Sequence, residues 1–95
     1  MDEISCLQAV VHGKVQGVGF RYFVMENAQA LELTGWTRNR LNRTVEVLAE
    51  GEKSDIELFL EKLRLGPRVS SVKKIDVEWL TPLNQYDKFS IRMTR

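Results

Sequence analysis

The spacing of apolar and polar positions changes several times along the chain, and each change predicts a new element. Residues 6–11 mix apolar and β-branched side chains, as strands do. From Phe20 to about Leu33 the apolar positions recur at three- and four-residue spacing, which predicts a helix closed by a glycine cap at Thr34-Gly35. A strand over 36–40, a turn over 41–43 and a strand over 44–50 follow. In this last strand Val45, Val47 and Ala49 alternate with Glu46 and Glu50.

The second half of the chain repeats the change from helix to strand. Ser54 with Glu57 three residues later is the pattern of a capping box, so a second helix is expected to begin after Ser54. Gly66-Pro67 stops this helix. A strand over 72–79, a loop around Pro82 and a last strand over 89–93 complete the chain. The apolar stripe of the second helix consists of Ile56, Phe59, Leu60 and Leu63.

The order β-α-β-β-α-β-β favours an α+β fold with two helices on one face of a largely antiparallel sheet. The ferredoxin-like α/β sandwich fits the first six elements, and the last strand is a short addition. Residues 1–95 are expected to form a single domain, because domains average about 150 residues. This fold serves many functions, so the function must be inferred from the site residues.

Composition and charge exclude several classes of function. Fourteen Lys and Arg against 13 Asp and Glu leave a net charge of +1, too small a basic excess for a general nucleic-acid binder. One cysteine, Cys6, and one histidine, His12, provide neither a disulfide nor a cysteine metal site. The chain has no apolar stretch of about 20 residues and starts without a signal-peptide pattern, so a cytoplasmic protein without membrane contact is expected.

The candidate chemistry lies in the glycine-rich stretch 13–21, between the first strand and the first helix. Gly13, Gly17 and Gly19 let the backbone turn so that successive N–H groups point into one concavity at a helix start, which suits phosphate. Arg21 opposes the helix dipole, by about 0.3–1 kcal/mol at an exposed site, which suggests that it clamps phosphate oxygens. The alternative is a plain glycine-rich connection with a solvated arginine, since the stretch is neither a P-loop nor a dinucleotide fingerprint.

The residues around this loop also resemble a known family. The run Gly13-x-Val15-Gln16-Gly17-Val18-x-Phe20-Arg21 is similar to the signature of the acylphosphatases. The stretch 33–39, which contains Gly35-Trp36 and Arg38-Asn39, resembles the second motif of that family, and further matches follow in order to residue 92. The resemblance covers nearly the whole chain.

The resemblance implies a metal-free and cofactor-free enzyme that hydrolyses acyl phosphates to a carboxylate and inorganic phosphate. By position, Arg21 would bind the phosphoryl group and Asn39 would orient the attacking water. Backbone N–H groups would cradle the phosphate, and Gly13 would help to shape the loop. The residues expected to supply these N–H groups are Gln16, Gly17, Val18, Gly19, Phe20 and Arg21. A monomer is the simplest expectation for a member of this size.

Several alternatives remain at this stage. Asn39 could simply cap the turn that follows it. The domain could be a catalytically silent module that binds phosphate or acyl phosphate through the same loop. An RNA-binding domain of this fold is disfavoured, because the strand over 44–50 has no aromatic residue and two acids.

One position departs from the family pattern, and the roles of the other polar residues are mostly structural. Arg43 stands where a glycine is usual, so the geometry of the turn after Asn39 is open. Arg38, Arg40 and Arg43 are expected to face solvent and to attract anionic substrate. His12 is expected to be a satisfied or solvent-facing strand residue.

Overall fold

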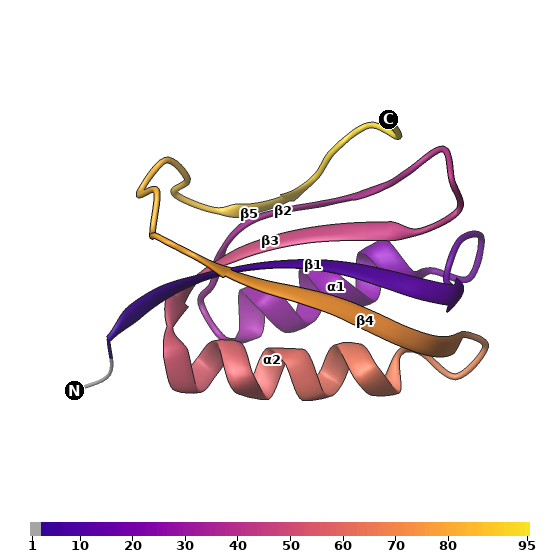
Figure 1. Cartoon of the computed structure of the whole chain (residues 1–95), viewed down its shortest axis with the longest axis horizontal. Coiled ribbons are helices and arrows are strands. Elements are labelled where there is room, and N and C mark those ends of the chain that lie inside the picture. The colour runs from indigo at the N-terminus through magenta and orange to yellow at the C-terminus, as the bar shows by residue number, and fades with distance from the viewer. Residues whose placement is uncertain (1–2) are drawn as a thin grey trace.

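The computed structural model describes residues 3–95 and confirms the predicted order of elements (Figure 1). The elements are β1 (Ile4–Lys14), α1 (Phe20–Ala30), β2 (Thr34–Asn39), β3 (Val45–Glu52), α2 (Lys53–Leu65), β4 (Ser71–Leu80) and β5 (Phe89–Ile91).

The five strands form one sheet in the order β4-β1-β3-β2-β5. All neighbouring strands are antiparallel except β2 and β5, which are parallel. Both helices cover the same face of the sheet in Figure 1. The α+β fold, a ferredoxin-like sandwich with a short C-terminal strand, is therefore confirmed.

The core lies between this face of the sheet and the helices. Alternate residues of the central strands point into it, and each helix contributes the stripe expected from its spacing. The fully buried side chains include Leu7, Ala9 and Val11 of β1, Val45, Val47 and Ala49 of β3, Phe20, Val24 and Ala28 of α1, and Ile56, Phe59 and Leu63 of α2. Leu60 is partly buried against the same cluster. The core therefore holds α1, and the loop before it, against the sheet.

The other face of the sheet is partly covered by the chain after β4. Cys6, Trp36 and Leu48 form a second apolar cluster there, with Tyr86 packed against it. Glu50 is only 4% exposed. Its carboxylate accepts hydrogen bonds from the backbone N–H groups of Leu83 (2.8 Å) and Asn84 (3.1 Å). Glu46 and Glu50 alternate with the core residues as expected, but both are buried, because this loop and neighbouring side chains cover them.

The end of α1 differs from the prediction. The helix ends at Ala30, and Gly35 lies inside β2 rather than at a helix cap. Glu32 instead takes the left-handed conformation, with φ 57°. Its N–H donates to the carbonyl of Gln29 (3.0 Å), and that of Leu33 donates to Ala28 (2.9 Å). These two bonds form a Schellman motif in which glycine is the usual residue at position 32.

Other element ends move by one to three residues. α2 begins at Lys53, so Ser54 lies within the helix and Glu52 occupies the N-cap position without a side-chain cap bond. β1 continues to Lys14, and β5 ends at Ile91 before the expected Met93. Gly66 ends α2 as expected, with its N–H bonded to the carbonyl of Lys62.

The cap of α1 generates a stability prediction. Replacing Glu32 with glycine relieves the left-handed strain of a residue that carries a Cβ, so we expect Glu32→Gly to raise the free energy of unfolding by about 0.5–1 kcal/mol. Urea unfolding measures this change. The control, Glu26→Gly within α1, should lower the same quantity by about 1 kcal/mol. Equal destabilisation by both variants would contradict the strain argument.

Candidate active site

The loop between β1 and α1 is held at both ends by buried side chains. Val15 and Phe20 are each only 1% exposed, and Val18 between them packs partly against the core. The aromatic ring of Phe20 also lies near that of Phe23, with 6.0 Å between centroids. Because these buried side chains fix the backbone on either side, the conformation of residues 16–19 is restricted.

Two of the three loop glycines have the backbone conformation that the loop requires. Gly17 and Gly19 both lie in the left-handed region, with φ 72° and 75°. Successive residues of opposite hand direct their N–H groups into one concavity. Gly13, however, lies inside β1, so it does not end the strand as expected. It sits at a register shift in the β1–β4 pairing, where an added Cβ would lie 2.1 Å from the Ser71 carbonyl oxygen. Only glycine allows this approach.

The first turn of α1 keeps its backbone donors available. Gly19 is the N-cap residue and has no side chain to cap the helix, and the first turn contains no acidic residue. The first N–H groups of a helix have no partners within it and carry the positive end of its dipole. Arg21 is half-buried in this turn, and within residues 3–95 no carboxylate pairs with it. This end of α1 therefore concentrates unpaired positive donors.

Asn39 is the last residue of β2. A short turn over 31–33 joins α1 to β2, and the two elements pack together while running in opposite directions (Figure 1). The start of α1 and the end of β2 therefore lie at the same end of the molecule. The side-chain oxygen of Asn39 is buried and has no hydrogen-bond partner among the described residues. An unpaired buried amide oxygen costs about 1–3 kcal/mol, which suits a group that a ligand or water completes.

The turn after Asn39 accommodates Arg43 in place of glycine. Arg43 itself takes the left-handed conformation, with φ 73°, whereas Asn42 does not. The N–H of Arg43 donates to the Arg40 carbonyl (3.0 Å), and the N–H of Arg40 donates to the Thr44 carbonyl (2.9 Å). This is the pattern of a three-residue hairpin loop that ends in a left-handed residue. The hairpin keeps its shape, and Arg43 carries strain that glycine would not.

The side chain of Gln16 reaches this hairpin. Its Nε2 donates to the carbonyl oxygens of Arg40 (2.8 Å) and Thr44 (2.9 Å). The sequence assigned only the backbone of Gln16 to phosphate binding, and no spacing pattern indicated that its side chain bridges two segments.

The chain after β5 extends the contact with β2. The N–H of Arg92 donates to the Thr37 carbonyl (2.8 Å), and that of Arg95 donates to the Asn39 carbonyl (3.1 Å). The Arg95 carbonyl in turn accepts from Leu41 (3.2 Å). The backbone of Asn39 is therefore fixed on its outer edge by the last residue of the chain, a contact that the strand pattern did not predict.

The remaining polar residues are mostly engaged in structure. His12 contacts Asp76 at 2.8 Å, which fits the expected satisfied strand residue. Burial and the neighbouring Glu50 raise the pKa of Cys6 to about 11, so this thiol is a poor nucleophile.

Arg38 corrects one expectation. It does not face solvent freely, because its side chain is 19% exposed and pairs with Glu46 at 2.8 Å. Arg40 is more exposed, but its Nη1 lies 3.6 Å from the same carboxylate, so it too is engaged in an ion pair. The Arg38 guanidinium also lies over the Trp36 ring, 4.9 Å from the centroid. Its position one residue before Asn39 in an alternating strand directs it to the opposite face of the sheet.

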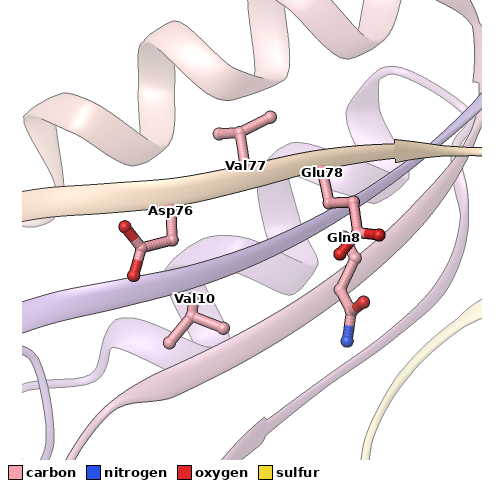
Figure 2. A pocket seen from close by; sticks show the side chains of 5 residues that line it. All are labelled: Gln8, Val10, Asp76, Val77 and Glu78. Carbon is pink, nitrogen blue, oxygen red and sulfur yellow. The ribbon is translucent and has the colours of Figure 1, made fainter.

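A shallow hollow on that opposite face is unsuited to phosphate. Figure 2 shows Asp76 and Glu78 pointing away from α2, whereas Val77 points toward the helix. Gln8 and Val10 of β1 complete its lining. Because two carboxylates would repel an anion, the loop 15–19 remains the candidate phosphate site.

Residues 3–95 contain no group of three or more His, Cys, Asp or Glu side chains that could hold a metal ion. In the same part of the chain, every helix is too short or too polar to cross a membrane.

Known proteins give an independent identification. The family model described as Acylphosphatase matches residues 7–91. A protein named acylphosphatase from Acaryochloris marina is 46% identical over 78 residues, which is 82% of this chain and 84% of that protein. One from Moorella thermoacetica is 48% identical over 73 residues, 77% of this chain and 78% of that protein.

Solved structures agree with the sequence relatives. The crystal structure of acylphosphatase from Bacillus subtilis superimposes with a TM-score of 0.90 at 39% identity, covering 95% of this chain and 99% of that one. An acylphosphatase from Coxiella burnetii gives a TM-score of 0.89 at 37% identity, with 94% and 93% covered. Because the family model spans residues 7–91 and these relatives are 37–48% identical over most of the chain, this chain belongs to the acylphosphatase family.

Proposed function

We propose that this enzyme hydrolyses the carboxyl-phosphate bond of acyl phosphates by in-line attack of a water that Asn39 orients. The observation that carries the proposal is the start of α1. There Gly17, Gly19 and an uncapped helix leave backbone donors unpaired beside Arg21, which has no carboxylate partner within residues 3–95. Such a group of donors is complementary to a phosphoryl group rather than to the acyl part of the substrate.

The chemistry requires few catalytic groups. Water forms a bond to phosphorus while the bond to the carboxylate oxygen breaks, and its electron pair leaves with the carboxylate. The proton of the water passes to a phosphate oxygen, which is the nearest base. A carboxylate is a good leaving group, so the transition state mainly needs charge stabilisation and in-line alignment.

Each site residue then has a distinct role. The N–H groups of Gln16 through Arg21 and the Arg21 guanidinium stabilise the charge on the equatorial oxygens of the phosphoryl group. The Asn39 side-chain oxygen accepts a hydrogen bond from the water, and this bond orients a lone pair of the water oxygen toward phosphorus. The same roles require neither a metal nor a cofactor.

The surface around the loop favours anionic substrates. Lys14 and Arg21 flank the β1–α1 loop, and Arg43 lies in the β2–β3 turn. These two connections lie at the same end of the molecule (right in Figure 1) and are joined by the side chain of Gln16. Glu32, Glu52 and Asp55 line a hollow at the opposite end. The small net charge therefore conceals an asymmetric distribution of charge, which attracts an anion toward the loop.

We also propose that the chain is a single domain that acts as a cytoplasmic monomer without nucleic-acid partners.

A silent module that binds phosphate through the same loop is the competing proposal. The buried, unpaired oxygen of Asn39 favours the enzyme, because a pure phosphate binder has no use for an extra acceptor beside an anion. Turnover of substrate decides between the two.

Hydrolysis of benzoyl phosphate by the purified protein, followed by its ultraviolet absorbance, tests the function directly. We expect turnover that is unchanged by EDTA, because backbone donors and Arg21 provide the charge stabilisation. Phosphate binding without turnover would support the silent module. Loss of turnover in EDTA, restored by a divalent ion, would overturn the metal-free mechanism.

The two side chains should fail in different ways. Asn39→Ala is expected to lower kcat about 100-fold or more while the inhibition constant of inorganic phosphate stays within about twofold, because the loop is intact. Arg21→Ala should lower kcat and also weaken phosphate binding. The matched controls, Asn27→Ala and Arg64→Ala, remove the same groups elsewhere on the helices and should leave both constants unchanged. An active Asn39→Ala enzyme would exclude the assigned role.

The charge distribution predicts a dependence on salt. Raising ionic strength from about 0.01 to 1 M shortens the Debye length from about 30 to 3 Å, so kcat/KM should fall on the order of tenfold while kcat changes little. Arg43→Gln should lower kcat/KM at low salt and flatten this dependence. Lys53→Gln removes the same charge at the opposite end and should do neither. Identical salt profiles for both variants would refute the steering argument.

A further inference from the structure

The side chain of Gln16 joins two segments that the proposed reaction must hold in register. It starts from the loop expected to bind phosphate and ends on the hairpin that follows Asn39. Its Nε2 lies 2.8 Å from the Arg40 carbonyl oxygen and 2.9 Å from that of Thr44. Both distances are those of good hydrogen bonds, and an amide nitrogen has two hydrogens, one for each carbonyl.

The two acceptors are the carbonyls at the base of the hairpin. Each already accepts one backbone N–H, that of Arg43 on the Arg40 carbonyl and that of Arg40 on the Thr44 carbonyl. A carbonyl oxygen has two lone pairs, so Gln16 takes the second of each. A single side chain therefore fixes both strands of the hairpin at the point where they meet.

This use of the amide leaves it little capacity to bind phosphate itself. With both N–H groups donated, the side chain retains only the Oε1 acceptor, which repels an anion. The backbone N–H of Gln16 remains the part assigned to the phosphoryl group. The main chain of Gln16 is thus part of the proposed phosphate loop, and its side chain is bonded to the hairpin.

The position of Asn39 depends on this hairpin. Arg40 directly follows Asn39, and the bond to its carbonyl fixes the peptide unit between Arg40 and Leu41, so Gln16 anchors the chain one residue beyond the asparagine. On the other edge of β2, the N–H of Arg95 holds the Asn39 carbonyl at 3.1 Å. The Arg95 bond fixes Asn39 within the sheet, whereas Gln16 fixes it relative to the phosphate loop.

We propose that Gln16 is a positioning residue that sets the place of the Asn39 carboxamide relative to the bound phosphoryl group, an inference that rests on the proposed hydrolytic function. Misplacement of a reacting group by about 1 Å can lower a rate on the order of 100-fold. Loss of the bridge should therefore slow the chemical step while phosphate binding survives.

Gln16→Met tests this inference, because methionine has a similar length and no donor. We expect kcat to fall on the order of 10- to 100-fold, with the inhibition constant of inorganic phosphate within about twofold. Gln16→Glu, whose carboxylate would face two carbonyl oxygens, should lower kcat at least as far. The matched control is Gln8→Met, which removes a side-chain bond of similar length (2.8 Å, to Glu46) on the far face of the sheet and should leave kcat unchanged.

A double-mutant cycle separates positioning from general damage. If Gln16 acts through Asn39, the Gln16→Met substitution should have little further effect on kcat in an Asn39→Ala background. An equal fold-loss in both backgrounds, or a weakened phosphate affinity at unchanged kcat, would overturn the inference.

A readout without turnover keeps this inference distinct from the proposed function. The side-chain amide resonances of Asn39 in an NMR spectrum should shift or broaden in Gln16→Met and stay in place in Gln8→Met. An inactive wild-type protein would refute hydrolysis and leave this measurement valid. Unchanged Asn39 resonances in an active protein would refute the positioning role alone.

Discussion

The site depends on one constraint, which is that a run of backbone N–H groups must stay unpaired and yet stay in place. Backbone donors in a folded protein normally pair within secondary structure. At the start of α1 they do not, because Gly19 has no side chain to cap the helix and the first turn has no carboxylate. The loop is kept in place by the core, in which the side chains of Val15 and Phe20 are buried at its two ends. The phosphoryl binding that we propose would then require little reorganisation, which is the condition for effective charge stabilisation.

The second constraint of the proposed mechanism is that Asn39 must lie opposite this loop, although it belongs to β2. Three sets of hydrogen bonds meet around it: the β2–β3 pairing, the chain after β5, and the amide of Gln16. Strain accumulates in the same region. Arg43 is left-handed where glycine would be relaxed, and the Asn39 oxygen is buried without a partner in the described chain. Departures from local rules of this kind concentrate where function requires a particular geometry.

The sequence predicted the elements that depend on local periodicity. The stripes of α1 and α2 and the alternation in β3 follow from which positions are apolar, so they could be read directly. It failed where distant segments decide the outcome. Gly35 resembled a helix cap, but it lies in β2, where an added Cβ would lie 1.9 Å from the Leu48 carbonyl oxygen of β3, and Glu32 takes the left-handed position at the helix end. Glu46 and Glu50 alternate like solvent-facing residues, but the loop after β4 and the arginines of β2 cover them.

The candidate site shows the same difference between local and distant signals. The motifs predict roles for Arg21 and Asn39, because the proposed chemistry is tied to a fixed spacing from the glycines. The side-chain contacts of Gln16 were missed, since they join residues that are 24 and 28 positions apart and leave no periodic signal. In the proposed mechanism, backbone N–H groups and Arg21 hold the phosphoryl group while Asn39 orients the water, so few functional side chains suffice. The reactive acyl phosphate removes the need for a strong acid or base, and the hardest remaining task is geometric. A neutral amide that donates to two carbonyls performs such a task without adding charge beside the phosphate, which lysine or arginine at position 16 would do.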